Sequence, residues 1–236
     1  MIVQPIKTNV FREGENLFSF IVNHFKKISE KSIIVITSKI VALSERRTAV
    51  IQNEITKERL IKKESRIAIP TKYVWLAIKD RMVMASAGID ESNANGKLIL
   101  LPKDSFKTAD YLRNTLMRRY KLKNLGILIT DSRTVPLRAG VVGVALGYAG
   151  FRGLKDYCGK LDIFGRKFKF SRSNIADSLA TAAVLVMGEG KEQQPLAVIK
   201  KAPVEFCDKI KKTELCIDIE DDMYCPFFSE IIKARK

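Results

Sequence analysis

Two short apolar runs constrain most strongly what this chain can fold into. "SIIVIT", residues 32–37, is rich in β-branched side chains and has the length of a buried strand, and "LGILITD", residues 125–131, also indicates a strand. Stretches with helical periodicity surround them, for instance "ENLFSFIVNHFKKI", residues 15–28, and "KTADYLRNTLMRRY", residues 107–120. Strands and helices that are intermixed in this way predict an α/β or α+β fold.

Further strands are expected along the rest of the chain. "GVVGVALGYAG", residues 140–150, contains four glycines, a spacing that suits a bulge or the close approach of another backbone. A pair of strands is expected around "DIFGRKFKFS", residues 162–171. The remaining strands are predicted over residues 2–7, 81–86 and 195–200.

Three more helices are expected. A basic helix covers residues 54–64, and Pro70 opens a short helix that contains Trp75. The clearest helix begins at Ser173 or Asn174, either of which can cap it, and ends at Gly188.

The size and composition of the chain indicate an ordinary globular protein. It has 236 residues, of which 46% are hydrophobic and 29% are charged, and no linker divides it. We therefore expect a single domain over residues 1–236, with two intimately packed subdomains as the alternative. No apolar run approaches the roughly 20 residues that span a bilayer, and the N-terminus lacks a secretory signal pattern. A cytoplasmic protein without a membrane partner is expected.

The charge and the metal-binding residue types narrow the chemistry. A net charge of +16 creates a field that favours anions such as nucleotides, while a nucleic-acid partner is an alternative that the lack of long basic runs does not favour. The single histidine, His24, argues against histidine metal sites and Ser-His-Asp catalysis. The four cysteines form no Cys-x-x-Cys pair, so reduced thiols are expected instead of a zinc site.

Two aspartates follow apolar runs and suit a hard cation. Asp90 lies in "SAGIDESNANGK" and Asp131 ends "LGILITD"; Ser132 adds a hydroxyl group beside the second carboxylate. Magnesium and manganese prefer such oxygen ligands and complete their coordination with phosphates and water. An aspartate at a strand end also serves as a turn former or a helix cap, so this alternative stays open. Asn93 is placed to bond a base or a ribose.

Glycines after the last helix give a weaker signal for phosphate. The backbone N–H groups of "MGEG", residues 187–190, could cradle a phosphate, or this turn could simply end the helix. The chain contains neither a P-loop motif nor a Rossmann fingerprint, so those two nucleotide sites are not supported.

Several motifs follow one another in a fixed order. They are "TSKIVALSERR", "SAGIDESN", "LLPKD", "ITDSRTVPLRAGVVGVALGYAG", "DYCGKLDIFGR" and "IADSLATAAVLVMGEG". In this combination, over about residues 8–198, the chain resembles the gamma-glutamyl ligases of coenzyme F-420 biosynthesis, the F-420-0:L-glutamate ligase family. The resemblance implies a mixed-sheet α/β (α+β) fold with intertwined subdomains and a homodimer. It also implies a GTP-dependent ligase that joins L-glutamate to an anionic carboxylate acceptor such as F-420-0 through an acyl phosphate, with manganese or magnesium and a potassium ion.

The resemblance also assigns residues. It implies a catalytic metal held by Asp90, Asp131 and Ser132, with Arg138 and Asp156 at further family positions near the phosphates or the acceptor. The implied nucleotide contacts are Thr8, Asn9, Val10, Phe11, Ser38, Lys39, Asn93, Met187, Gly188, Glu189 and Gly190, continuing to Gln193.

The chain departs from the family pattern near these residues. Leu43 stands where the family has a lysine that contacts the nucleotide, and "DSRTV", residues 131–135, lacks a glycine and an arginine of the family motif. Ser86 replaces an asparagine, and Ser178 replaces an acidic residue. Two alternatives follow: the same ligase chemistry on another acceptor (a folate, another small carboxylate or a protein carboxyl terminus), or a degenerate homologue that binds nucleotide or RNA without turnover.

Overall fold

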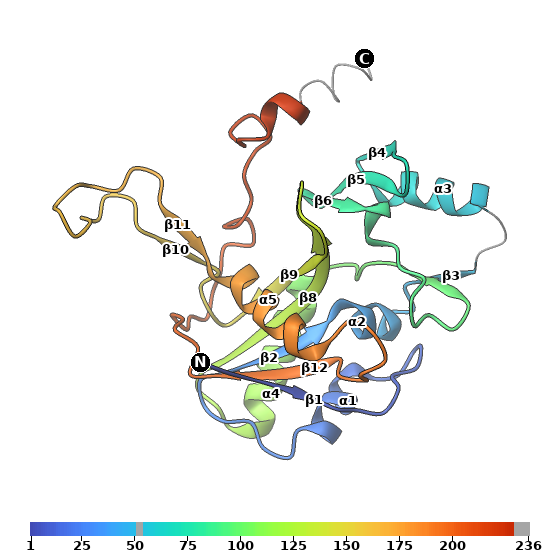
Figure 1. Cartoon of the computed structure of the whole chain (residues 1–236). Coiled ribbons are helices and arrows are strands. Elements are labelled where there is room, and N and C mark those ends of the chain that lie inside the picture. The colour runs from blue at the N-terminus through green and yellow to red at the C-terminus, as the bar shows by residue number, and fades with distance from the viewer. Residues whose placement is uncertain (51–53, 229–236) are drawn as a thin grey trace.

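A mixed five-stranded sheet forms the centre of the protein. The computed structural model describes residues 1–50 and 54–228 (Figure 1). The strands lie in the order β1 (Ile2–Ile6), β12 (Leu196–Lys200), β2 (Ser32–Thr37), β8 (Leu125–Thr134) and β9 (Val141–Ala149). β2 and β8 are parallel, whereas the other neighbours are antiparallel. This sheet, together with the helices around it, confirms the predicted α+β class.

Helices cover both faces of the sheet, which explains the uninterrupted apolar character of "SIIVIT". Side chains alternate between faces along β2, so Ile34 and Ile36 join one core and Ile33 and Val35 join the other. The first core includes α1 (Leu17–His24), α2 (Ser38–Ser44) and α4 (Ser105–Tyr120), and the second includes α5 (Ile175–Met187). In Figure 1, α5 crosses one face of the sheet and α4 lies on the other.

Glycines in β9 allow helices to approach the sheet closely. A Cβ atom at Gly143 would lie 2.4 Å from the carbonyl oxygen of Ala180 in α5, and one at Gly147 would lie 2.5 Å from the carbonyl carbon of Ser105 in α4. The register between β8 and β9 also shifts between Ile129 and Thr130, which marks a bulge. Both roles predicted for the glycine spacing are therefore confirmed.

A smaller layer carries the segment that leads to Asp90. It contains α3 (Glu54–Glu64), the ribbon β3 (Thr48–Val50) with β7 (Lys97–Ile99), the sheet β4 (Ile67–Pro70), β5 (Trp75–Lys79) and β6 (Met82–Ala85), and the 3₁₀ turn η1 (Ser86–Gly88). Figure 1 shows this layer at the upper right of the central sheet. It approaches the central sheet mainly where β6 meets β8.

The short helix predicted after Pro70 is wrong. Pro70 is the last residue of β4, and a turn in which Thr71 N–H donates to Val74 O (2.9 Å) leads straight into β5. Proline needs no N–H partner at the end of an outer strand, so its fixed φ suits this hairpin as well as a helix start. Trp75 pairs with Pro70 across the two strands.

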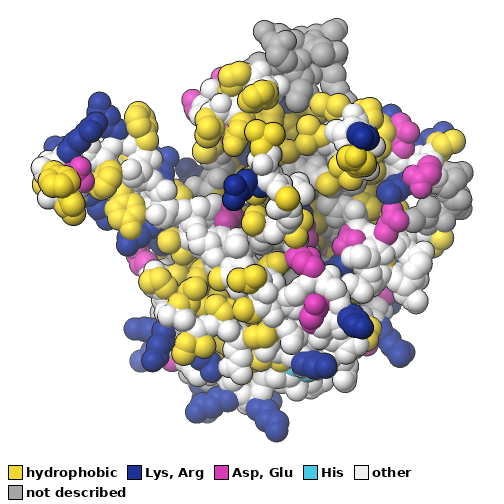
Figure 2. Space-filling model, viewed as in Figure 1, with side chains coloured by type: hydrophobic (Ala, Val, Ile, Leu, Met, Phe, Trp, Pro, Cys, Tyr) yellow, Lys and Arg dark blue, Asp and Glu magenta, His cyan; other side chains and the backbone are white. Residues whose placement is uncertain are grey.

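An arm projects from the body between residues 154 and 174. Its paired strands are β10 (Leu154–Asp156) and β11 (Arg172–Asn174), with a single further bridge between Leu161 and Lys167. The pair of strands expected around residues 162–171 is therefore present and flanks them. Figure 2 shows apolar and basic side chains side by side on this arm.

The helix expected over residues 54–64 and the capped helix that ends at Gly188 are confirmed, whereas the short strands β3, β4 and β7 were not predicted. Asn174 caps α5 by accepting from the N–H of Asp177, and Gly188 ends the helix. The short helix α2 was not predicted. Within the described residues, no helix combines the length and the apolar character needed to cross a bilayer. Cys158, Cys207 and Cys216 carry free thiols and are partly exposed.

Candidate active site

The segments assigned to metal and nucleotide binding meet at one end of the central sheet. Five contacts join them in pairs. These are Thr8 N–H to Gln193 O (2.9 Å), Ser38 Oγ to Asp131 Oδ1 (3.0 Å), Lys39 Nζ to Asp90 Oδ2 (2.9 Å), Asn93 Nδ2 to Gly190 O (3.3 Å) and Ser132 Oγ to Glu189 Oε1 (2.5 Å). We call this cluster the carboxylate site.

The strand directions explain why these segments converge. β2 and β8 are parallel, and Thr37 pairs with Thr130, so the residues that follow, Ser38 and Asp131, lie side by side. β12 is antiparallel to β2, which brings the segment before Leu196 to the same end, and Ile6 at the end of β1 pairs with Leu196. Carboxyl ends of parallel strands are a common place for ligands in such sheets.

Asp131 lies within a strand and does not form a turn. β8 continues three residues past it, to Thr134, so the expected end of the strand at Asp131 is wrong. One carboxylate oxygen accepts from Ser38 Oγ, and the other is paired with Arg133. The side chain of Asp131 is 24% exposed, so the carboxylate still reaches the surface of the cluster.

Asp90 combines a turn-forming role with a charged partner. Its carboxylate accepts from the N–H (2.7 Å) and the hydroxyl group (3.0 Å) of Ser92, and it pairs with Lys39. The turn-forming alternative is thus realised in the same side chain that was assigned to the metal. Partial burial raises the pKa of Asp90, but the bonds from Lys39 and Ser92 outweigh it and hold that pKa below its ordinary value. The carboxylate is therefore charged at neutral pH.

The predicted nucleotide residues divide into buried anchors and exposed neighbours. Thr8, Phe11, Ser38 and Met187 are buried, whereas Lys39 is partly buried. The exposed members of the set are Asn9, Val10, Asn93, Gly188, Glu189 and Gly190. The buried residues fix the backbone next to these exposed groups, whose contact with a nucleotide stays a prediction.

Two assigned residues lie outside the carboxylate site. Arg138 is exposed in the loop between β8 and β9, where its N–H donates to Val135 O (3.1 Å). Asp156 is exposed on β10, where it pairs with Arg172 (3.1 Å) and accepts from the N–H of Cys158 (2.7 Å). The structure does not bring either side chain to Asp90 or Asp131, and their roles stay predictions.

Sequence reasoning missed two members of the site. Ser92 bonds the Asp90 carboxylate, and Arg133 pairs with Asp131. Each lies two residues after its aspartate. In a strand this spacing places Arg133 on the same face as Asp131, and after an aspartate it is the position that an Asx turn uses. Both signals are readable in the sequence but are common in other proteins as well.

A lysine, Lys39, lies close to Leu43, the residue that replaces the family lysine. Leu43 lies on α2 four residues after Lys39, on the same helical face, and packs against the small apolar cluster of Ala42, Ala94 and Ile99. Lys39 therefore supplies an amine one turn away from the missing family lysine. Arg46 instead lies beside Gly14, where a Cβ atom would be 3.0 Å from its Nη2.

The side chains present fit a hard cation whose remaining ligands come from a phosphate. Asp90, Asp131, Ser132 and the neighbouring Glu189 offer only oxygen atoms. In the described part of the chain, no group of three or more His, Cys, Asp or Glu side chains is arranged to hold a metal alone. Magnesium and manganese usually take one or two carboxylates and obtain their other ligands from phosphate and water, so this donor set suits them.

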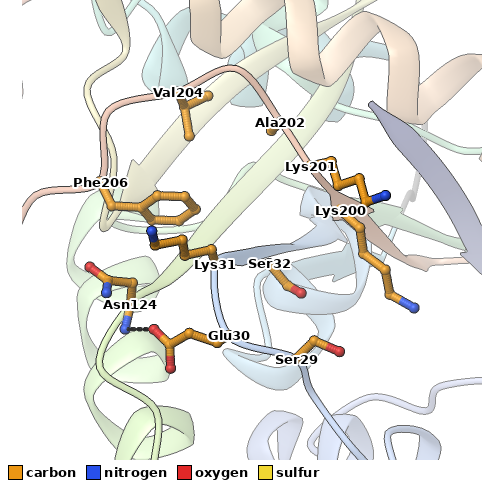
Figure 3. Close-up of a pocket in the computed structure, with 10 residues that line it drawn as sticks. All are labelled: Ser29, Glu30, Lys31, Ser32, Asn124, Lys200, Lys201, Ala202, Val204 and Phe206. Atoms are coloured by element: carbon orange, nitrogen blue, oxygen red, sulfur yellow. Dashed lines mark hydrogen bonds between the residues drawn. The ribbon is translucent and has the colours of Figure 1, made fainter.

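A cavity of about 730 Å³ lies at the opposite end of the sheet (Figure 3). It is lined by Ser32 at the start of β2, Lys200 at the end of β12, and Phe206. None of the residues assigned to metal or nucleotide binding lines it. Because β2 separates it from Ser38 by roughly 20 Å of strand, this cavity is not part of the carboxylate site.

Comparisons with known proteins place this chain among the gamma-glutamyl ligases. A family model described as F420-0:Gamma-glutamyl ligase matches residues 56–201. The chain is 34% identical over 215 residues to the coenzyme F420:L-glutamate ligase of Methanococcus maripaludis strain C7, covering 84% of this chain and 86% of the relative.

Two further relatives carry the same name. The Archaeoglobus fulgidus protein is 29% identical over 209 residues, covering 81% of this chain and 83% of the relative. The Methanothermobacter thermautotrophicus protein is 40% identical over 138 residues, covering 58% of this chain and 54% of the relative. The chain belongs to the F420-0:gamma-glutamyl ligase family.

Proposed function

We propose that this protein is a GTP- and divalent-metal-dependent gamma-glutamyl ligase. It joins L-glutamate to a carboxylate acceptor such as coenzyme F-420-0. The observation that carries the proposal is the pairing of two adjacent residues, Ser38 and Lys39, with the two separate carboxylates Asp131 and Asp90. In a chain of this family, that arrangement gathers oxygen ligands and a cation where a triphosphate would lie.

The reaction has two steps that this site would serve. An oxygen of the acceptor carboxylate attacks the γ-phosphorus of GTP, and the bond to the bridging oxygen breaks with release of GDP. The amine of L-glutamate then attacks the acyl carbon, phosphate leaves with the electrons of the C–O bond, and the nitrogen loses a proton. Phosphoryl transfer depends on in-line positioning and on neutralising charge on the phosphate oxygens.

The residues of the carboxylate site have separate tasks in this scheme. Asp90, Asp131 and Ser132 would hold manganese or magnesium, which supplies positive charge to the phosphate oxygens when bound. Lys39 adds a cation of the protein itself, and we propose a potassium ion as a further counter-ion of the phosphates. The exposed residues around Asn9, Asn93 and Gly190 bind the nucleotide, while Arg138 contacts the phosphates or the acceptor.

A reconstituted reaction tests the proposal. Protein incubated with GTP, manganese, labelled L-glutamate and F-420-0 should release GDP and form a labelled amide. Asp90→Asn and Asp131→Asn should abolish metal-dependent GTP binding and retain the wild-type circular dichroism spectrum. Asp110→Asn, an exposed aspartate of α4, is the matched control and should behave as wild type. Normal binding of GTP and manganese by either site variant would overturn the assignment.

The acceptor is a separate question, because the "DSRTV" segment departs from the family motif beside Asp131. A folate, another small carboxylate or a protein carboxyl terminus is the alternative acceptor. Mass spectrometry of the products from a mixed acceptor pool distinguishes these cases. Exclusive glutamylation of F-420-0 would exclude the alternatives.

A homologue without turnover makes a different prediction. If the +16 charge serves RNA binding, gel-shift affinity should be measurable at low salt and should fall steeply as salt is added. We expect GTP turnover and no RNA binding at low salt. RNA binding without GDP release would favour the degenerate homologue instead.

We also propose that the protein is a homodimer, and the arm supports this. Ile163, Phe164 and Phe170 are 91%, 88% and 87% exposed on it, among several Lys and Arg side chains. Met223 and Phe227, 81% and 71% exposed, lie just after the acidic stretch of residues 218–222. An apolar basic arm and an apolar acidic segment complement each other, and a second copy of the chain offers each its counterpart.

Sedimentation of arm variants tests the dimer. The double variant Ile163→Ser, Phe164→Ser should sediment as a monomer at concentrations where the wild type is a dimer. Tyr73→Ser removes a side chain that is 84% exposed on the turn between β4 and β5, and it should leave the dimer intact. A monomeric wild type, or a dimer in the double variant, would contradict this part of the proposal.

A further inference from the structure

Arg133 is a buried cation attached to one of the two proposed metal ligands. It lies on β8, and only 9% of the residue is exposed. Its Nη1 donates to Asp131 Oδ2 and to Ser132 O (2.9 Å), and its Nη2 lies 3.7 Å from the Sδ atom of Met84 in β6. The guanidinium group thus occupies the space between the central sheet and the smaller layer, directly behind the carboxylate site.

The hydrogen bonding of this guanidinium group is incomplete. Among the described residues, its buried Nε atom finds no hydrogen-bond partner and its Nη2 finds only a thioether sulfur, which is a weak acceptor. Buried charged donors are costly when they are not fully bonded, so most of the compensation comes from Asp131. A cation that binds the Asp131 carboxylate therefore leaves the charge of Arg133 without its compensating anion.

We propose that Arg133 is the internal counter-ion of Asp131 and makes divalent-cation binding at the carboxylate site depend on a bound nucleotide. It is a positioning residue, because it acts through Asp131. The inference rests on the proposed function, since it uses the same metal ligands.

Electrostatics gives the direction of the effect. A divalent cation on Asp131 would lie close to the guanidinium charge, and repulsion between like charges at such a distance is strong where water is largely excluded. A triphosphate removes that penalty, because its negative charge offsets both cations. Without nucleotide the cation should therefore bind weakly, and with nucleotide it should bind tightly.

Titration with manganese tests the inference without measuring activity. Free Mn²⁺ is followed by electron paramagnetic resonance, with and without a non-hydrolysable GTP analogue. In the absence of nucleotide, Arg133→Gln should bind Mn²⁺ at least about tenfold more tightly than the wild type. Arg133→Lys keeps the charge and should resemble the wild type. Arg152→Gln removes an exposed arginine that pairs with Glu205, and it controls for net charge.

A purely structural role of Arg133 predicts the opposite change in Mn²⁺ affinity. If Arg133 only supports the fold, both Arg133→Gln and Arg133→Lys should bind Mn²⁺ more weakly than the wild type. Arg133→Met, which can keep the contact with Met84, serves as a second neutral variant should the glutamine variant unfold. Unchanged or weaker Mn²⁺ binding by the folded neutral variants would overturn the inference.

The result also separates this inference from the proposed function. Wild-type protein that binds Mn²⁺ only with the nucleotide, together with neutral variants that do the same, refutes the role of Arg133 and leaves the metal site standing. Absence of Mn²⁺ binding in every protein, with or without nucleotide, refutes the metal site itself.

Discussion

Lys39 Nζ lies 2.9 Å from Asp90 Oδ2, and the preceding residue, Ser38, donates to Asp131 Oδ1 at 3.0 Å. Two consecutive residues at the start of α2 therefore fix carboxylates that come from different layers of the fold. One layer is the central sheet and the other is the smaller layer above it. The relative placement of these layers thus sets the distance between the two carboxylates.

The Lys39–Asp90 pair predicts how stability responds to pH. Because the pKa of Asp90 lies below its ordinary value in the folded chain, ionised Asp90 stabilises the fold above about pH 4. This contribution is lost as the pH falls through the lowered pKa. Urea unfolding should show wild type more stable than Asp90→Asn at pH 7, with the difference vanishing near pH 3. The contribution should be small, since the Asp90 side chain is 46% exposed. A difference that stays constant between the two pH values would contradict the prediction.

Close packing between β9 and α5 predicts a large effect of a small substitution. Gly143→Ala would place a Cβ atom 2.4 Å from the backbone oxygen of Ala180, and backbone cannot move aside as a flexible side chain can. We expect a loss of about 3 kcal/mol in the free energy of unfolding. Gly140→Ala is the control, because no atom of the described residues lies within 4 Å of its Cβ position and its positive φ alone is strained, at a cost of about 1 kcal/mol. If both variants lose the same free energy of unfolding in urea, α5 moves away from the new Cβ atom at little cost, and the prediction is wrong.

Ser86 offers a stabilising change at the turn that leads to Asp90. Its φ is 48°, in the left-handed region where asparagine is favoured over most residues. Ser86→Asn should raise the free energy of unfolding by about 0.5 kcal/mol, whereas the β-branched Ser86→Val should lower it by about 1 kcal/mol. Thermal unfolding of the two variants measures both. If both variants change the free energy of unfolding in the same direction, the backbone of Ser86 is not in the left-handed region.

The sequence predicted the elements whose pattern reflects one dominant interaction. β2 and β8 are apolar throughout because both faces of the sheet are covered, and α5 carries its cap, its small-residue face and its terminal glycine within the helix itself. The close approach at Gly143 was likewise readable, since only a missing side chain permits it. In each case the local signal and the tertiary contact agree.

Other elements depend on partners that lie far away in the chain. β5 is a strand because β4 and β6 pair with it on both sides, which Pro70 and Trp75 do not reveal. α2 has seven residues, too few for a clear period, and it is held by packing of Ile40, Val41 and Ala42. The tip of the arm has a strand-like composition but only one bridge, between Leu161 and Lys167.

The candidate site shows the same division. Asp90 and Asp131 were recognised as candidates from their places after apolar runs, and the resemblance to a family supplied the nucleotide segments. The convergence of Asp131 with the nucleotide segments follows from the direction of four strands, which no single motif encodes, whereas Asp90 comes from the smaller layer. Arg133 was missed because a basic residue two positions after an aspartate is common, and the sequence does not show that β6 buries this one.

Tyr148 and Glu214 form a buried anchor for the segment that follows β12. The phenol of Tyr148 is fully buried and donates to Glu214 Oε1 (2.5 Å), which also accepts from the N–H of Gly153 (2.7 Å). Burial and the Glu214 carboxylate raise the pKa of Tyr148, so the phenol stays a donor at physiological pH.

Removing this acceptor should therefore cost more than removing a surface charge. Glu214→Ala leaves the Tyr148 hydroxyl and the Gly153 N–H without their acceptor, and we expect a loss of about 2 kcal/mol in the free energy of unfolding. Tyr148→Phe should cost about half as much, because the carboxylate keeps its bond to Gly153. Glu205→Ala is the matched control, since its exposed pair with Arg152 should contribute less than about 0.5 kcal/mol. Urea unfolding measures all three variants, and limited proteolysis should cut Glu214→Ala faster after residue 200. If Glu214→Ala unfolds at the same urea concentration as Glu205→Ala, the C-terminal segment is held by its apolar contacts instead of by this anchor.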